Sequence, residues 1–95
     1  MSIPPITSIG SALSVYYSHA ELGNKEIKKL FGKLSPTTVA KLKRIVKDEM
    51  WKSGVASFGS YTVNTEVAYR VWGIDVDALE RRLQKLRELQ IEPVS

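Results

Sequence analysis

The stretch NKEIKKLFGKLSPTTVAKLKRIVKDEM, from Asn24 to Met50, decides the fold. Its first part predicts a short helix that Asn24 caps at the N-terminus, with Glu26 in the first turn, where the helix dipole favours an acid. The apolar residues of this helix recur at the spacing of one helical face: Ile27, Leu30 and Phe31. Gly32 follows, and a glycine there is typical of the left-handed residue that ends a helix. The stretch therefore begins with an amphipathic helix and a tight turn.

A second helix is expected directly after this turn. Leu34 fills the turn with an apolar side chain, and Ser35 before Pro36 is a strong start signal, because serine caps a helix and proline fits its first position. The apolar face of this helix consists of Val39, Leu42, Ile45, Val46 and Met50. The opposite face, at 100° per residue, consists of Thr37, Ala40, Lys41, Arg44 and Lys47. The outer face is thus hydroxyl-bearing at its start and basic further along.

The positive charge of the chain is concentrated on these two helices. Nine of the fourteen Lys and Arg residues lie between Lys25 and Lys52, against three acids, so this segment carries +6 and the rest of the chain −2. A pI near 9.5 favours an acidic partner, with nucleic acid first among them. The chain has no cysteine and one histidine, His19, so we expect no disulfide, no metal site and no cofactor.

The segments before this stretch are less regular. Residues 1–10 contain Pro4 and Pro5 and are expected to form an extended N-terminal arm. Ser11 to Ser18 is apolar enough for a first helix, and the sequence Ser18-His-Ala-Glu21 matches a capping box, which suggests a further short helical turn. The main domain is expected to span residues 11–92, with its central helix pair at 24–50.

Trp51 to Thr62 is rich in glycine and serine, and we expect a loop there. A small β-hairpin within Val55 to Val63, turning at Gly59-Ser60, is the alternative, and it would make a wing beside the helix pair. The loop is favoured because the strands of such a hairpin would be very short.

Two more helices are expected after this segment. Asn64 or Thr65 caps a helix that runs through Trp72 and ends at Gly73, and Asp75 caps the last helix. Tyr69 and Trp72 are expected to be core aromatics. The last helix carries an apolar seam of Val76, Leu79, Leu83 and Leu86, with Leu89 beyond it. The seam either covers the domain's own core, which we favour, or joins two copies of the chain through residues 76–89.

With this pattern in place, the chain resembles the helix-turn-helix superfamily of DNA-binding proteins. The matching residues are Ile27, Phe31, Gly32, Leu34, Val39 and Leu42. The resemblance covers about a third of the chain. It departs from the family's pattern at Lys28, where a small residue is usual, and at Lys33, which lengthens the turn by one residue. The small size and the threonine-rich second helix also look like the regulators of phages and mobile elements.

The resemblance implies that the second helix enters the major groove of duplex DNA. Its residues would then meet base edges or phosphate: Ser35, Thr37, Thr38, Lys41, Arg44 and Lys47. Cations of the first helix and the turn would hold the phosphate backbone: Lys25, Lys28, Lys29 and Lys33. A weaker echo of the pattern at Thr65 to Leu83 has mixed charge, so we expect it to pack on the first helix pair and not to read DNA.

The expected fold is therefore all-α, with four to five short helices and room for a small β wing. The expected function is sequence-specific binding of double-stranded DNA by a cytoplasmic transcriptional regulator, with no membrane segment and no enzyme activity. A homodimer or higher oligomer is compatible with this function. Two alternatives remain open. One is a DNA-packaging or assembly adaptor of a phage or mobile element, and the other is a helical protein-interaction module.

Overall fold

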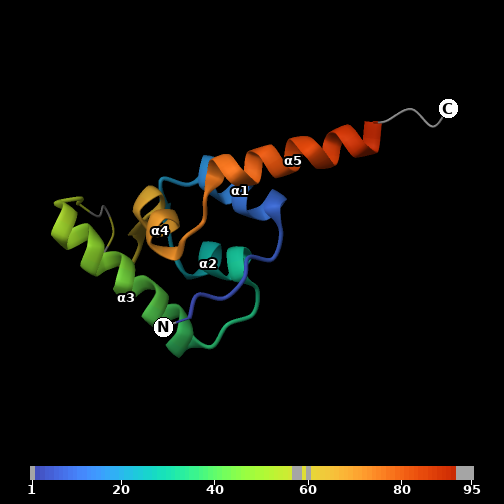
Figure 1. Ribbon diagram of the computed structural model, residues 1–95. Helices are drawn as coiled ribbons and strands as arrows, with labels where there is room; N and C mark the ends of the chain where they lie inside the picture. The colour runs from blue at the N-terminus through green and yellow to red at the C-terminus, as the bar shows by residue number, and fades with distance from the viewer. Residues whose placement is uncertain (1, 57–58, 60, 92–95) are drawn as a thin grey trace.

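The computed structural model describes residues 2–56, 59 and 61–91, and Figure 1 shows the arrangement of its elements. In chain order these are α1 (Ile9–Ser18), β1 (Glu21–Leu22), α2 (Asn24–Phe31), α3 (Pro36–Ser53), β2 (Val63–Asn64), α4 (Thr65–Trp72) and α5 (Val76–Ile91). The described residues thus form five helices and one two-stranded sheet. This confirms the all-α class with a small β element. The predicted domain end at Glu92 lies outside the described residues.

The core lies where α2, α3 and α4 meet, with α1 closing one side (Figure 1). The inner stripe of α3 is buried as predicted at Val39, Leu42, Val46 and Met50, and Ile45 is half-buried against the same core. Both predicted core aromatics are buried. The ring of Trp72 stands edge-on to Phe31 with 5.3 Å between centroids, and the hydroxyl of Tyr69 donates to the carbonyl oxygen of Ala12 at 2.6 Å.

Several predicted caps are present. The Ser35 hydroxyl accepts from the Thr38 amide at 3.2 Å, with Pro36 at the first helical position. The Asn64 side chain accepts from Val67 N, and Asp75 accepts from Ala78 N. Gly73 ends α4 in the left-handed conformation, with φ of 74°. These caps fix where α3, α4 and α5 begin, and they were readable because each uses a local signal.

The start and end of α2 differ in detail from the prediction. Asn24 is the first helical residue, and Gly23 before it is the cap. The Glu26 carboxylate accepts from the Gly23 amide at 3.0 Å, so the acid closes the first turn in place of an asparagine side chain. Gly32 ends α2 with φ 84° and ψ −154°, a positive φ outside the left-handed helical region. The positive φ requires glycine, and a Cβ at Gly32 would in addition make a tight contact of 3.2 Å with Thr7 Cγ2.

The predicted helical turn at Ser18–Glu21 is wrong, because Glu21 and Leu22 form a strand. β1 pairs antiparallel with β2, with Glu21 opposite Asn64 and Leu22 opposite Val63. The Leu22 and Val63 side chains are both fully buried, and this burial outweighs the local capping pattern. The pair joins the chain before α2 to the chain after α3, so it encloses the predicted helix pair.

α3 is longer than predicted. The helix continues through Ser53, and Gly54 ends it with φ of 71°, so Trp51 is helical and not in a loop. No residue between Met50 and Gly54 breaks a helix, which explains the extension. Beyond Gly54, the described residues up to Thr62 contain no strand, and β2 begins only at Val63 and pairs with β1. Ser60, and with it the predicted hairpin turn, lies outside the described residues.

The N-terminal arm is extended to Ser8, as predicted, and α1 starts at Ile9, two residues earlier than expected. Thr7 fixes the arm to α2. Its amide donates to the Leu30 carbonyl at 2.7 Å and its hydroxyl to the Lys29 carbonyl at 3.0 Å. Ile3 and Ile6 pack against the core. The arm therefore covers the end of α2 and its carbonyl groups.

α5 extends away from the rest of the molecule, as Figure 1 shows in orange and red. Along the predicted seam, Val76 and Leu79 pack against the core and Leu83 is half-buried. Leu86 is 44% exposed and Leu89 is 67% exposed. The core interpretation thus holds for the start of the seam, and the later leucines lie in solvent.

Candidate functional site

The outward face of α3 presents the predicted side chains to solvent. Thr37, Lys41 and Arg44 are exposed and lie opposite the buried Leu42 and Val46. Three to four residues separate neighbours within this set, so they form one stripe along the first three turns of the helix. Such a stripe of side chains can contact the inside of a single groove of a partner molecule.

The α2 cations are also exposed. Lys25 and Lys29 are four residues apart on the side opposite the buried Ile27 and Leu30, and Lys33 is exposed in the turn. Lys28 lies about 100° from Lys29 on the helix, on the side that turns toward α3. Of the four predicted cations, Lys28 is therefore the one on the side of α2 that faces α3.

A cleft of about 250 Å³ separates α2 from α3. Asn24 and Lys28 line it from α2. From α3 it is lined by Pro36, Val39, Ala40 and Lys43. Lys43 was not among the predicted site residues, because its helical position lies between the inner and outer faces. The signal that could have found it is its spacing, since Pro36, Ala40, Lys43 and Lys47 form one edge of α3.

The charge of this cleft is not neutralised by the fold. Burial lowers the pKa of Lys43, and repulsion from Lys47 lowers it further. The described part of the chain gives neither Lys28 nor Lys43 an ion-pair partner; the ion pairs found there are His19–Glu26, Arg70–Glu49 and Lys85–Glu88. A lowered lysine pKa means that the ammonium is disfavoured in the free protein. An anion in the cleft would reverse that effect.

The three acids between Lys25 and Lys52 do not line this cleft. The Glu26 carboxylate lies 3.9 Å from His19 Nδ1 and accepts from the Gly23 amide. Its burial raises the pKa, but the backbone hydrogen bonds and the nearby cations outweigh burial, so the pKa is lowered overall and the group stays ionised. Glu49 pairs with Arg70 of α4 at 3.7 Å. Asp48 is exposed on α3, four residues beyond Arg44.

The three predicted hydroxyls have different surroundings. Ser35 Oγ lies 2.9 Å from Thr38 Oγ1 and accepts from the Thr38 amide, so these two groups close the start of α3. Thr37 is exposed, and no hydrogen bond engages its hydroxyl among the described residues. Of the three, Thr37 is the one whose hydroxyl is available to a partner.

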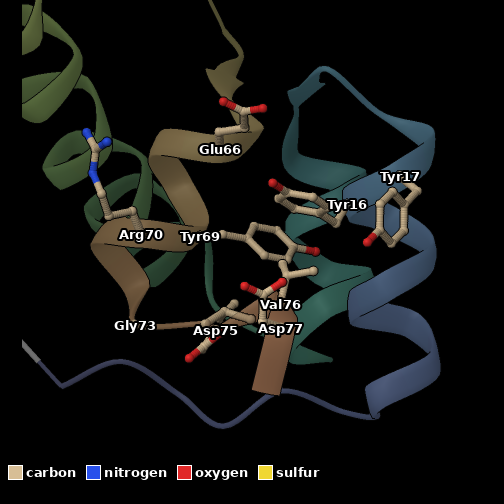
Figure 2. Close-up of a pocket in the computed structure, with 10 residues that line it drawn as sticks. Tyr16, Tyr17, Glu66, Tyr69, Arg70, Gly73, Asp75, Val76 and Asp77 are labelled. Carbon is tan, nitrogen blue, oxygen red and sulfur yellow. The ribbon is translucent and has the colours of Figure 1, made fainter. Parts of the chain in front are cut away.

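A second hollow, of about 610 Å³, is lined by acidic side chains, whereas the cleft between α2 and α3 is basic (Figure 2). It lies where α1, α4 and the start of α5 meet, and the rings of Tyr16 and Tyr69 stand at its centre, 5.0 Å apart. Among the described residues that line it, the carboxylates are Glu66, Asp75 and Asp77, and the cation is Arg70. Arg70 points away from the tyrosines in Figure 2 and pairs with Glu49. Because these carboxylates repel anions, the hollow is not a candidate site for phosphate. The carboxylates all belong to the Thr65–Leu83 segment, for which the sequence predicts no DNA contact.

Comparison with protein-family models, with curated proteins and with solved structures gave no significant match. Residues 2–56, 59 and 61–91 include no group of three or more His, Cys, Asp or Glu placed to hold a metal ion. No helix in the same ranges has the length and apolarity needed to cross a bilayer.

Proposed function

We propose that this chain binds double-stranded DNA through α2 and α3, as a sequence-specific, non-enzymatic regulator of transcription in the cytoplasm. The observation that carries the proposal is the unneutralised cleft between Lys28 and Lys43, beside the exposed stripe of Thr37, Lys41 and Arg44 on the same helix. Lys28 and Lys43 contact phosphate on one side of the groove. Thr37, Lys41 and Arg44 meet base edges.

The dimensions of α3 suit this role. At 1.5 Å per residue its 18 residues span roughly 27 Å, and the segment from Thr37 to Arg44 spans roughly 11 Å. The major groove is about 12 Å wide, so that segment fits within it. The strands β1 and β2 pair across the segment that contains α2 and α3, so this pairing closes the segment into one unit.

The predicted phosphate contacts follow from the cation positions. Lys28 and Lys43 lie in the cleft, and Lys25, Lys29 and Lys33 are exposed on α2 and the turn. Each phosphate that a cation neutralises releases counterions, so the logarithm of affinity falls with the logarithm of salt by about 0.9 per contact. Binding through three to five of these lysines would therefore be strongly salt-dependent.

A second candidate is a DNA-packaging or assembly adaptor, and the extension of α5 favours it. Leu86 and Leu89 are exposed on a helix that projects from the body, which suits contact with a second copy through residues 76–89. A dimer suits a regulator equally, because two copies bind two half-sites. The two functions differ in sequence preference: a regulator selects one site, and an adaptor binds most duplexes alike.

The test is duplex binding by variants of matched charge. Lys41→Ala with Arg44→Ala should leave the fold intact and weaken binding by roughly 1–3 kcal/mol for each side chain that reads a base. Arg81→Ala with Arg82→Ala removes the same charge from exposed positions of α5 and is the control. Selection from a pool of random duplexes identifies the DNA sequence that the chain prefers. Equal affinity of the two double variants would refute the assigned face, and selection of no preferred site would favour the adaptor.

A further inference from the structure

Trp51 is unusual in α3 because its large aromatic side chain lies in solvent. Its side chain is 88% exposed, whereas Trp72, the other tryptophan, is 4% exposed. Trp72 donates its indole N–H to the Leu42 carbonyl, and no hydrogen bond engages the indole of Trp51 among the described residues. A large ring in water contributes almost nothing to the core, because the hydrophobic effect scales with the area removed from water. The fold alone gives no reason for a tryptophan here.

The immediate surroundings of Trp51 combine apolar and cationic groups. Together with Lys47, Met50 and Val55 it lines a hollow of about 150 Å³. A neighbouring hollow of about 310 Å³ is lined by Met50, Trp51, Gly54, Val55 and Ala56. The site therefore offers one aromatic wall, an apolar floor and an ammonium group at its edge. A ligand that places an apolar ring beside an anionic group would suit it.

The position of Trp51 along α3 indicates where such a ligand would lie. It follows Arg44 by seven residues and Lys47 by four, so it continues the same side of the helix. It lies 14 residues beyond Thr37, roughly 21 Å along the axis at 1.5 Å per residue. Because the major groove is about 12 Å wide, an α3 whose first turns occupy the groove places Trp51 over the adjacent sugar–phosphate strand.

The charges near Trp51 favour an anionic occupant. Arg44, Lys47 and Lys52 are cations on this half of α3, and Asp48 is the acid that remains exposed there. The remaining acid, Glu49, is turned to α4, where it pairs with Arg70 and accepts from the Ser53 hydroxyl.

We propose that Trp51 and Lys47 form a contact for the DNA backbone that flanks the groove. The indole ring packs against a deoxyribose, its N–H donates to a phosphate oxygen, and the Lys47 ammonium lies against the next phosphate. This proposal rests on the proposed function and names a contact that the basic face alone does not supply. It also accounts for the length of α3, since the last two turns reach past the groove.

The experiment uses the full chain and a mixed-sequence duplex of about 30 base pairs, which is three helical turns. Quenching of tryptophan emission by iodide should fall when duplex is added. The fall should be absent in Trp51→Phe, which retains only the buried Trp72 as an emitter. Trp51→Ala should weaken duplex binding roughly tenfold with an unchanged salt slope, because a neutral side chain releases no counterions. Tyr17→Ala, which removes an exposed aromatic from α1, is the control and should bind as the parent does.

The outcomes separate this contact from the function on which it rests. If Trp51→Ala binds with parent affinity while Lys41→Ala with Arg44→Ala binds weakly, the Trp51 contact is refuted and the DNA-binding function stands. Protection of Trp51 that rises with protein concentration in the absence of duplex would instead place a second copy there, and would also overturn the contact. A chain that binds no duplex even at low salt would overturn both.

Discussion

The indole N–H of Trp72 donates to the main-chain carbonyl of Leu42 at 3.2 Å. Leu42 lies in the middle of α3, and Trp72 is the last residue of α4, so this bond joins the two helices at a buried position. The Phe31 ring packs edge-on against the same indole from the end of α2. One tryptophan thus fixes α3 relative to both neighbouring helices, and with it the direction in which the basic face points.

Trp72→Phe should destabilise the fold without changing the exposed face of α3. The loss of one hydrogen bond and of part of a buried aromatic should together cost about 1–3 kcal/mol of unfolding free energy. Urea denaturation followed by circular dichroism measures it. Tyr61→Phe, an exposed aromatic change, is the control and should be neutral. A Trp72→Phe variant as stable as its parent would mean that α3 and α4 are held together by other contacts.

The cleft lysines Lys28 and Lys43 should both contribute to binding, and the charge of Lys43 should oppose folding. Lys43→Met keeps the apolar stem and removes a charge that burial and Lys47 disfavour, so it should be at least as stable as the parent at neutral pH. It should also reduce the salt slope of duplex binding by about 1, and Lys28→Ala should do the same. Lys85→Ala on α5 is the control for the removal of one lysine.

The pH dependence of the Lys43 effect has a definite sign. A base whose pKa is lower in the folded state costs stability while it is charged, and that cost declines as pH rises from its folded pKa to its unfolded pKa. The stability difference between Lys43→Met and the parent should therefore be present at pH 7 and shrink at alkaline pH, toward the ordinary lysine value of 10.5. A difference that grows with pH would contradict the stated environment of Lys43.

Substitutions at the leucines of α5 should distinguish positions needed for folding from positions needed for assembly. Leu83 is half-buried, so Leu83→Glu places a carboxylate in a partly desolvated position and should destabilise the domain. Leu86→Glu with Leu89→Glu changes exposed positions and should leave the melting temperature unchanged. If α5 joins two copies, the double variant should sediment as a monomer where the parent is a dimer. A parent that is monomeric at every concentration tested would remove the dimer from the proposal.

The parts of the fold that the sequence predicted are those set by local signals. Ser35-Pro36, Asn64, Gly73 and Asp75 each mark a helix end through a bond within four residues, and each is found where expected. The parts that it missed depend on distant partners. β1 forms because Leu22 and Val63 are buried together across 41 residues, which no local pattern records.

The candidate site shows the same division. The exposed stripe of α3 follows from helical periodicity, so Thr37, Lys41 and Arg44 were predictable as solvent-facing. The role of Lys43 depends on how α2 lies against α3, which no local pattern contains. The sequence predicts a loop at Trp51, because the glycines and serines after it suggest an earlier helix end. Its place on the basic side of α3 follows only from the extension of the helix to Ser53.

The hydroxyls at the start of α3 should divide into a structural one and one that reads DNA. Ser35→Ala removes the cap on the Thr38 amide and should cost about 1 kcal/mol of stability. Because the cap lies outside the exposed stripe, the preferred DNA site should stay the same. Thr37→Ala should leave stability within about 0.5 kcal/mol, since its side chain is exposed, and should change which base is preferred at one position of the selected site.

Thermal melts and selection from a random duplex pool, carried out on both variants, distinguish the structural hydroxyl from the one that contacts DNA. Thr37→Ser is the matched variant, because it keeps the hydroxyl and removes only the methyl group that can meet a thymine methyl. If Ser35→Ala alters the selected site and Thr37→Ala does not, then α3 approaches DNA with its capped end and not with its exposed stripe. The orientation assigned to α3 would then be wrong, even if the chain binds DNA.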